Sequence, residues 1–437
     1  MLVHKNTRVS LLRDLPQKIR DGKAIISVVG MGRVGLPLAL VLARSGLRVI
    51  GVDVDTQRVS SLNNGEMPFH YPAIRVWLKE ALKAKLFTST SDSKRAIEEC
   101  DVIVLTVGTP TGEQNQIDYS QLHAALAEVT STSLRGKALI LRSTSVPGTI
   151  KRIVMPMLSN KSLSTVGVDF ALAACPERIL EGQAHKELYE LPEIIGAEDT
   201  LSATIASELF RKISKDKKIL VTTPTGAELA KLFTNIYRYV NFALANEFAI
   251  WAERYGEDAH EIIRVANENY VRSKIPRPGF AGGPCLSKDG MLLDNGTTFS
   301  SIISAAWKLN EAVPQHVVMA LLNEFGTLYG MKLAVLGLSF KADSDDLRLS
   351  PSVKLVELLK AYGAIVKVHE PHVPDSLGLE QALQGSDVVI LATNHTAFTS
   401  LAPTIEASGC VLVYDVWGMF DPKDFVHTRY RRFGRAA

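Results

Sequence analysis

Short apolar runs alternate with helical patterns through the first two hundred residues of the chain. Five of these runs have the length of buried strands: Ala24–Val29, Arg48–Val52, Val102–Val107, Ala138–Arg142 and Phe170–Ala174. Strands that alternate with helices are typical of a parallel sheet covered on both faces. The pattern therefore predicts an α/β fold with a doubly wound sheet.

A long stretch of helical periodicity follows, and few helix-breaking residues interrupt it. Residues 227–255 predict a single helix that ends at Gly256. From about Lys332 the chain repeats its first region in outline, because KLAVLGLSF matches AIISVVGMG and IVKVHEP matches RVIGVDVD. We therefore expect two Rossmann-like doubly wound domains joined by a long central helix. The apolar segment NFALANEFAIWA exceeds what one buried helix face needs, which predicts a homodimer or a larger assembly.

Composition argues against several classes of protein. Hydrophobic residues make up 46% of the 437 residues and charged residues 22%, as in an ordinary globular protein. The formal net charge of +3 is too small to indicate a nucleic-acid partner. No apolar run approaches the roughly 18 residues of a membrane helix, and the N-terminus lacks the apolar core of a signal peptide. We expect neither a nucleic-acid nor a membrane partner.

A dinucleotide site is predicted at Gly30-x-Gly32-x-x-Gly35, which follows a strand pattern and opens a helix pattern. Arg33 and Val34 lie within this loop. Asp53 ends the next predicted strand, where a carboxylate binds a ribose diol and repels a 2′-phosphate. The cofactor is therefore expected to be NAD rather than NADP, and Arg58 is a nearby cation that would soften this preference.

Two later loops follow strands of the same sheet and are candidates to line the nicotinamide half of the site. The first contains Thr109 and Pro110, and the second is Ser-Thr144-Ser-Val-Pro-Gly148. Glycine, proline, serine and threonine are also ordinary turn residues, so turn chemistry is the alternative interpretation.

The stretch Gly282-Gly-Pro-Cys285-Leu-Ser-Lys288-Asp289 brings a thiol, an ammonium and a carboxylate together. A cysteine nucleophile works as its thiolate, which a neighbouring cation stabilises. Asp289 would then orient water or transfer a proton. The alternative is a buried structural cysteine beside a surface ion pair. The four cysteines have no metal-ligand spacing, which favours reduced thiols in the cytoplasm and no metal site; Cys100, Cys175 and Cys410 are expected to be core residues.

Six motifs in this order resemble the UDP-glucose/GDP-mannose dehydrogenase family: the glycine loop, STSVPG, PER, the long lysine-bearing helix, GGPCLSKD and FKADSDDLR. The resemblance implies oxidation of the C6 hydroxymethyl group of a UDP-sugar to a carboxylate with two NAD, giving a uronic acid for surface polysaccharide. It also implies three segments: 23–215 as the NAD-binding domain, 216–325 as the central helical domain, and 326–437 as the UDP-sugar-binding domain. Residues 1–22, which precede the part covered by the resemblance, are expected to be an N-terminal extension.

The resemblance assigns a role to each matching residue. Cys285 would form a thiohemiacetal and then a thioester, with Asp289 handling water and protons. Lys231 and Asn235 lie one helical turn apart and would stabilise the C6 oxyanion. The remaining assignments are Glu177 in thioester hydrolysis, Thr144 in positioning water, Lys288 at the cofactor, and Arg178, Arg272, Gly282, Lys341 and Arg348 at the substrate. By default Asp345 and Asp346 would cap a helix that starts near Ser350.

The site combines features of different family members. Pro284 and Lys288 stand where many amino-sugar enzymes have histidine before the cysteine and no lysine after it. Pro-Glu-Arg-Ile-Leu-Glu-Gly favours UDP-N-acetylglucosamine or UDP-N-acetylmannosamine over UDP-glucose as the substrate. Two other functions remain open. One is a two-electron NAD dehydrogenase of a hydroxy acid, and the other is a non-catalytic nucleotide-sugar-binding protein.

Overall fold

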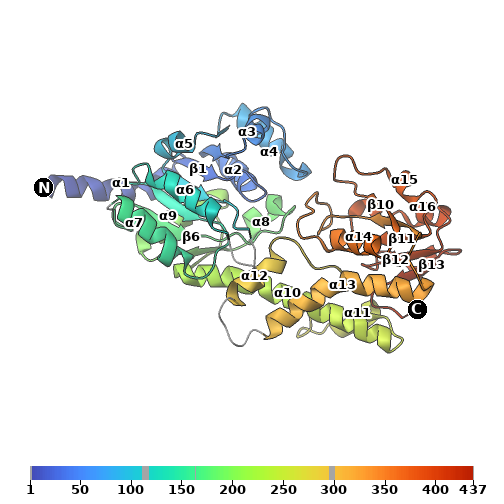
Figure 1. Cartoon of the computed structure of the whole chain (residues 1–437). Helices are drawn as coiled ribbons and strands as arrows, with labels where there is room; N and C mark the ends of the chain where they lie inside the picture. Colours follow the sequence, from blue (N-terminus) through green and yellow to red (C-terminus); the bar gives the residue numbers. More distant parts are fainter. Residues whose placement is uncertain (1, 111–117, 163, 295–300, 437) are drawn as a thin grey trace. The chain divides into compact units, whose positions relative to one another are not determined.

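The computed structural model describes residues 2–110, 118–162, 164–294 and 301–436. The chain divides into two compact units, Met1–Phe233 and Thr234–Ala437, which we call the N-terminal and C-terminal units (Figure 1). Over the described ranges, every helix is too short or too polar to cross a membrane. The predicted α/β fold is confirmed, whereas the four predicted domain bounds stay a prediction.

The N-terminal unit contains a sheet in the order β3-β2-β1-β4-β5-β6-β7-β8, whose neighbours are parallel except for the pair β6–β7. Alternate residues of a strand face opposite sides of the sheet. The strands are β1 Ile25–Val29, β2 Arg48–Val52, β3 Phe87–Thr90, β4 Val102–Leu105, β5 Ala138–Leu141, β6 Ala171–Ala174, β7 Glu193–Gly196 and β8 Ile219–Thr222.

Helices cover both faces of this sheet. Val102 and Val104 pack in the core beneath α1, α2, α4, α8 and α9, whereas Ile103 and Leu105 pack beneath α5, α6 and α7. The helices are α1 Leu2–Arg20, α2 Gly35–Arg44, α3 Thr56–Asn63, α4 Pro72–Lys83, α5 Ser93–Glu99, α6 Ser120–Thr130, α7 Met155–Ser162, α8 Ala184–Glu190 and α9 Thr200–Ile213. The N-terminal extension packs on its own unit, because α1 lies against α9 and buries Leu12, Leu15 and Ile19.

The long predicted helix is α10, Pro224–Arg254, which continues through the division at Phe233 and is followed by Gly256 with a φ of +77°. The C-terminal unit has a parallel sheet in the order β10-β9-β11-β12-β13. Its strands are β9 Lys332–Leu336, β10 Ile365–His369, β11 Val388–Leu391, β12 Leu412–Asp415 and β13 Arg429–Arg432. Its helices are α11 Ala259–Asn267, α12 Leu286–Asp294, α13 Ser301–Phe325, α14 Pro351–Ala361, α15 Leu379–Leu383 and α16 Ala402–Ala407.

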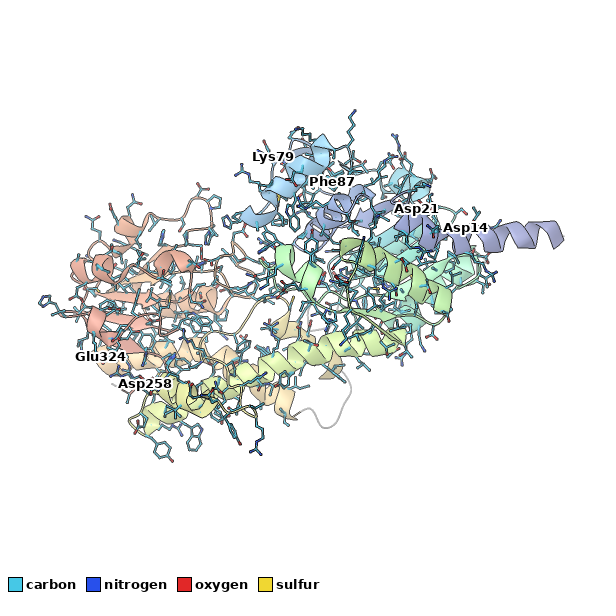
Figure 2. The ribbon with its side chains drawn as sticks, turned by 180° about the vertical axis from the view of Figure 1, so that it is seen from behind. Asp14, Asp21, Lys79, Phe87, Asp258 and Glu324 are labelled. Atoms are coloured by element: carbon cyan, nitrogen blue, oxygen red, sulfur yellow. The ribbon has the colours of Figure 1, made fainter. Side chains whose placement is uncertain are left out.

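The edge strand β13 is fixed to the helical part of the C-terminal unit by ion pairs. Arg432 binds Asp258, and Arg429 binds Glu324; both acidic residues are labelled in Figure 2. Asp258 also caps α11 by accepting the backbone amide of His260. The chain's last strand is therefore part of the folded unit rather than a loose end.

The predicted internal repeat is visible in backbone detail. The Gly30 amide donates to the Val52 carbonyl at 2.7 Å, and the Gly337 amide donates to the His369 carbonyl at 2.8 Å. Both glycines end the first strand of their copy with a positive φ, +99° and +92°. Only glycine adopts this conformation readily, which explains why both copies have glycine here.

The acid that ends the second strand also has the same role in both copies. Asp53 accepts the Met31 amide at 2.8 Å, and Glu370 accepts the Leu338 amide at 2.7 Å. The copies differ in the segment that comes after the glycine turn. In the first copy this segment is the helix α2, whereas in the second the loop 338–350 precedes α14.

Candidate active site

The glycine loop between β1 and α2 has the geometry that a dinucleotide requires. A Cβ on Gly35 would lie 1.8 Å from the Gly30 carbonyl oxygen, so the turn closes only around glycine. A Cβ on Gly32 would meet no atom within 4 Å, so this glycine leaves open space at the start of α2. Backbone amides at a helix N-terminus, with room in front of them, fit a pyrophosphate.

Two side chains of the glycine loop point to different surroundings. Val34 precedes α2 and is exposed. Arg33 is half-buried, binds Glu181 Oε1 at 2.7 Å and places its guanidinium 5.1 Å from the centre of the Phe69 ring. The ion pair therefore connects the cofactor loop to the segment that follows β6.

Asp53 lies where an NAD-binding acid is expected, at the end of β2. It is 6% exposed and accepts hydrogen bonds from the Met31 amide at 2.8 Å and the Asp55 amide at 3.0 Å. Arg58 Nη1 also donates to it at 2.9 Å. The residues present fit NAD, and Arg58 reduces the negative charge of the carboxylate, as the sequence suggested.

The loops that follow β4 and β5 are joined to each other. Thr109 Oγ1 donates to the Thr144 carbonyl at 2.6 Å, and Ser143 Oγ donates to the Val107 carbonyl at 2.6 Å. Thr109 is buried, whereas the neighbouring Pro110 is exposed. The structure therefore brings Thr109 and Thr144 together at the carboxyl ends of adjacent strands, where ligands bind in such sheets.

A buried acid that the sequence did not single out supports the second of these loops. Glu228, near the start of α10, accepts the Gly148 amide at 2.6 Å and the Ile150 amide at 2.9 Å. Burial raises the pKa of Glu228 above its ordinary value, although the two amides act against this. These partners lie far away in the sequence, so no local motif marks the residue.

Glu177 and Arg178, both predicted from the PER motif, follow β6 and are half-buried. Arg142 Nε donates to Glu177 Oε2 at 2.7 Å, and Arg142 Nη1 donates to Glu193 Oε1 at 2.8 Å. The Arg178 guanidinium donates to the Pro192 carbonyl. Arg142 and Glu193 were not predicted, because the sequence places them at the ends of strands where nothing distinguishes them from ordinary charges.

Cys285 lies immediately before α12 and is exposed, in contrast to the other three cysteines, which are buried. Its carbonyl accepts the Asp289 amide at 3.2 Å in the first turn of the helix, which also contains the half-buried Lys288. A helix N-terminus and a nearby cation both stabilise a thiolate. The alternative of a buried structural cysteine is therefore wrong.

The glycines before Cys285 allow the chain to pass close to the loop 338–350. A Cβ on Gly282 would lie 2.5 Å from the Pro351 ring, and one on Gly283 would lie 2.4 Å from the Phe340 ring. The Gly283 amide also donates to the Leu349 carbonyl at 2.9 Å. Any side chain at these two positions would push the cysteine loop away from its neighbour.

Asn235 and Asp289 are brought together in the C-terminal unit. Asn235 Nδ2 donates to Asp289 Oδ2 at 2.7 Å, and both side chains are buried. Lys231 belongs to the same helix α10, one turn earlier, and is 4% exposed. It is therefore not the solvated surface lysine that a helix usually carries. Arg272 is exposed, with its guanidinium 5.2 Å from the centre of the Tyr270 ring.

The loop 338–350 carries the two remaining predicted residues. Lys341 is half-buried, and Arg348 is exposed and binds Asp346 Oδ2 at 2.6 Å. The helix α14 is capped by Ser350, whose side chain accepts a backbone amide of the first turn. The expectation that Asp345 and Asp346 cap this helix is therefore wrong, because Ser350 is adjacent to it and already supplies the acceptor.

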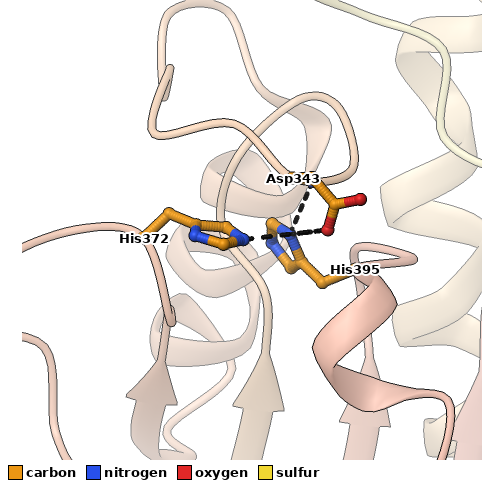
Figure 3. A group of neighbouring side chains, drawn as sticks. All are labelled: Asp343, His372 and His395. Carbon is orange, nitrogen blue, oxygen red and sulfur yellow. Dashed lines mark hydrogen bonds and ion pairs between the residues drawn. The ribbon is translucent and has the colours of Figure 1, made fainter. Parts of the chain in front are cut away.

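A cluster of Asp343, His372 and His395 lies in the same unit (Figure 3). One ligand atom from each lies within 4.8 Å of the others, a spacing open to a metal ion. However, His395 Nδ1 accepts the Asp343 amide at 2.9 Å, and its Nε2 lies 3.1 Å from Glu370 Oε2. A ring nitrogen has one lone pair, so a metal at Nδ1 would have to displace that amide. We therefore interpret the cluster as a set of contacts that hold the loop 338–350 in place.

The predicted site residues fall into two groups. The N-terminal unit contains Gly30, Gly32, Arg33, Val34, Gly35, Asp53, Arg58, Thr109, Pro110, Thr144, Glu177, Arg178 and Lys231. The C-terminal unit contains Asn235, Arg272, Gly282, Cys285, Lys288, Asp289, Lys341 and Arg348. The first group has the features of a cofactor site, and the second contains the exposed Cys285 and its neighbours.

Comparison with known proteins gives matches along most of the chain. Three models of the UDP-glucose/GDP-mannose dehydrogenase family match: the NAD binding domain at residues 24–214, the central domain at 225–326 and the UDP binding domain at 334–422. A UDP-N-acetyl-D-mannosamine dehydrogenase of Pyrococcus horikoshii is 36% identical over 86% of this chain and 90% of its own length. An NDP-N-acetyl-D-galactosaminuronic acid dehydrogenase of Ralstonia nicotianae is 32% identical over 91% of this chain and 96% of its own. The solved structure of UDP-D-ManNAc dehydrogenase from Pyrococcus horikoshii has a TM-score of 0.88 and 33% identity, covering 94% of this chain and 99% of that one.

Proposed function

Because the chain belongs to the UDP-glucose/GDP-mannose dehydrogenase family, we propose that it oxidises C6 of a UDP-N-acetylhexosamine to a carboxylate through a thioester on Cys285. The family membership makes it an NAD-dependent nucleotide-sugar dehydrogenase. The substrate, the covalent route and the role of each residue go beyond this membership. The exposed Cys285 at the N-terminus of α12 is the observation on which the covalent route depends.

The proposed reaction balances over two oxidations and one hydrolysis. NAD, when bound, accepts a hydride in each oxidation. The C6 alcohol first loses a hydride and a proton to give an aldehyde, which the Cys285 thiolate attacks to form a thiohemiacetal. Loss of a second hydride and proton gives the thioester. Water then adds to the acyl carbon, the carbon–sulfur bond breaks, the thiol returns, and the sugar leaves as a carboxylate.

The side chains supply charge and orientation for these steps. Lys231 and Asn235 would donate to the C6 oxygen while it carries negative charge. The hydrogen bond from Asn235 to Asp289 fixes a carboxylate in the first turn of the helix that follows Cys285. Asp289 would take up protons as the C6 oxygen changes state, and Glu177 and Thr144 would assist the hydrolysis. Lys341 and Arg348 would bind the diphosphate and the sugar, together with Arg178, Arg272 and Gly282.

The substrate class is supported by two separate observations. The PERILEG segment favours an N-acetylated sugar, and the relatives from Pyrococcus horikoshii and Ralstonia nicotianae carry the names of N-acetylated hexoses or their uronic acids. UDP-glucose is the alternative substrate. The other two functions, a two-electron hydroxy-acid dehydrogenase and a non-catalytic nucleotide-sugar-binding protein, fit the structure less well. Neither function requires an exposed cysteine at a helix N-terminus, or the nearby carboxylate of Asp289 held by a hydrogen bond from Asn235.

We further propose a homodimer or larger assembly, built on α10. In the C-terminal unit, this helix exposes large apolar side chains at helical spacing, Tyr237, Leu244, Phe248 and Trp251, and the exposed Tyr255 follows its last residue. The four domain segments 1–22, 23–215, 216–325 and 326–437 are proposed as functional divisions. A reducing, cytoplasmic compartment is proposed because the nucleophile must remain a thiol.

The decisive experiment measures NADH formed per sugar consumed, across a panel of UDP-hexoses and their N-acetyl forms. Two NADH per UDP-N-acetylmannosamine or UDP-N-acetylglucosamine would support the proposal, whereas one NADH would rule out the thioester step. Cys285→Ser should abolish the second oxidation, with Cys410→Ser as the matched control on a buried thiol. Normal turnover by Cys285→Ser would remove this cysteine from the mechanism.

A further inference from the structure

A buried guanidinium lies at the carboxyl ends of β5 and β6 in the N-terminal unit. Arg142 is 2% exposed, donates through Nε to Glu177 at 2.7 Å, and donates through Nη1 to Glu193 at 2.8 Å. Its Nη1 also donates to the Cys175 carbonyl at 3.1 Å. The guanidinium carbon lies 4.9 Å from the centre of the Phe210 ring. The group is thus held at two edges and over one face, which leaves it little freedom to move.

The carboxylate of Glu177 is held at both oxygens. Oε2 lies 2.7 Å from both Nε and Nη2 of Arg142. Oε1 accepts the Arg178 amide at 2.7 Å and the Ile179 amide at 2.8 Å. All four partners are donors, and an ionised carboxylate, which only accepts, matches them. In this arrangement Glu177 is a fixed negative charge that shapes the turn 176–179, rather than a group placed to carry a proton.

Glu193 shares the same guanidinium from the opposite edge. Burial raises the pKa of Glu193 above its ordinary value, with Arg142 acting against this. Burial alone would lower the pKa of Arg142, but Glu177 and Glu193 raise it overall. The arginine therefore stays charged. Protonation of Glu193 would leave Arg142 bound to Glu177.

We propose that Arg142 is a positioning residue for the hydrolysis of the Cys285 thioester, because it fixes the orientation of the Glu177 carboxylate. This inference rests on the proposed function. Glu177 acts on the hydrolysis through its charge and its fixed orientation, and the proton of the attacking water passes to Asp289, which the proposed function makes the proton acceptor. Glu193 supports the guanidinium from behind and takes no part in the reaction.

The test uses three variants and follows the acyl-enzyme directly. Arg142→Lys replaces the planar fork by one ammonium, which cannot hold both carboxylates in their present geometry. Glu177→Asp keeps the negative charge but shortens the side chain by one methylene, which moves the carboxylate away from its present position. Glu193→Gln is the matched control, since it keeps a neutral acceptor on the other edge of the same guanidinium. Each protein is mixed with NAD and UDP-N-acetylmannosamine, and quenched samples are read by intact-protein mass and by NADH absorbance.

We expect Arg142→Lys to form NADH in the first turnover and then to stall as the thioester. Hydrolysis should slow by about 10²-fold, the usual consequence of displacing a reacting group by about 1 Å. Glu177→Asp should stall in the same way, which keeps the test decisive if Arg142→Lys does not fold. Glu193→Gln should hydrolyse the thioester nearly as fast as the wild type.

Three outcomes would overturn the inference. Arg142→Lys and Glu177→Asp could hydrolyse the thioester normally, or they could lose both oxidations equally, as a purely structural fault would cause. A pH profile of hydrolysis whose acid limb moves in Arg142→Lys would instead make Glu177 a proton carrier. A wild type that gives one NADH per sugar would refute the proposed function itself, which is a different result.

Discussion

Glu370 offers a quantitative test of how the C-terminal unit holds the loop 338–350. Its side chain is 1% exposed and accepts the Leu338 amide at 2.7 Å and the Ser339 amide at 2.9 Å. Its Oε2 also lies 3.1 Å from His395 Nε2. Burial alone would raise the pKa of Glu370, but the bonds to His395 and the two amides lower it to about 2. The perturbation is Glu370→Gln, which keeps the shape of the side chain and removes its charge.

The pKa shift gives both the size and the pH dependence of the expected effect. A fall from the ordinary 4.5 to about 2 corresponds to about 3 kcal/mol of folding free energy. Because the pKa of Glu370 is lower in the folded state, this stabilisation is complete above about pH 5 and is lost as the pH falls toward 2. We therefore expect Glu370→Gln to cost about 3 kcal/mol at pH 7, and much less near pH 2.

Two measurements check this expectation. Thermal unfolding at pH 7 should show the transition of the C-terminal unit lowered by roughly 6–12 °C. Hydrogen exchange of the Leu338 and Ser339 amides should accelerate by about 10²-fold. Glu357→Gln, an exposed position on α14, is the matched control. If Glu370→Gln matched this control, or if its cost grew as the pH fell, the electrostatic explanation would be refuted.

Three further outcomes are expected. Glu228→Gln should destabilise the N-terminal unit by only about 1 kcal/mol. Because burial raises the pKa of Glu228, wild-type stability falls as the pH rises through that pKa, so the difference between the variant and the wild type should shrink from pH 4 to pH 7. Denaturant unfolding measures this difference, and a difference that grows with pH would contradict the reasoning. Asp53→Ser should raise the NADP-to-NAD ratio of kcat/KM by about 10²-fold, because it removes a negative charge facing the 2′-phosphate and leaves Arg58 in place; an unchanged ratio would show that another group selects the cofactor. Trp251→Glu, on the exposed apolar face of α10, should yield a monomer in analytical ultracentrifugation, and a persisting dimer would place the interface elsewhere.

Local patterns in the sequence were sufficient for much of the fold. The five predicted strands are all present: one has the predicted bounds, and the other four are shorter by one or two residues, because a buried apolar run has few other structural interpretations. The strands β3, β7 and β8 of the N-terminal unit and β12 and β13 of the C-terminal unit were missed. FTST is polar, EIIG has only two apolar side chains between Glu193 and Gly196, and RYRR is mostly arginine, so these segments do not look like buried strands.

Some residues of the candidate site could also be predicted from the sequence, and others could not. The glycine loop, Asp53 and Cys285 were predictable because each belongs to a compact motif, and Asn235 because it lies one turn from Lys231 on a strongly periodic helix. Arg142 and Glu228 were not predictable. Their partners lie about 35 to 80 residues away, and only the folded sheet brings those charges into contact.

The two Rossmann-like copies share the same backbone contacts at the ends of their first two strands, and they differ in the segment that follows the glycine turn. In each copy a glycine and an acid close the first two strands, and they depend on backbone amides more than on any ligand. The loop 338–350 lies in the place where the first copy begins a helix. Insertions or exchanges within it can therefore accumulate over evolutionary time while the backbone of both copies stays unaltered.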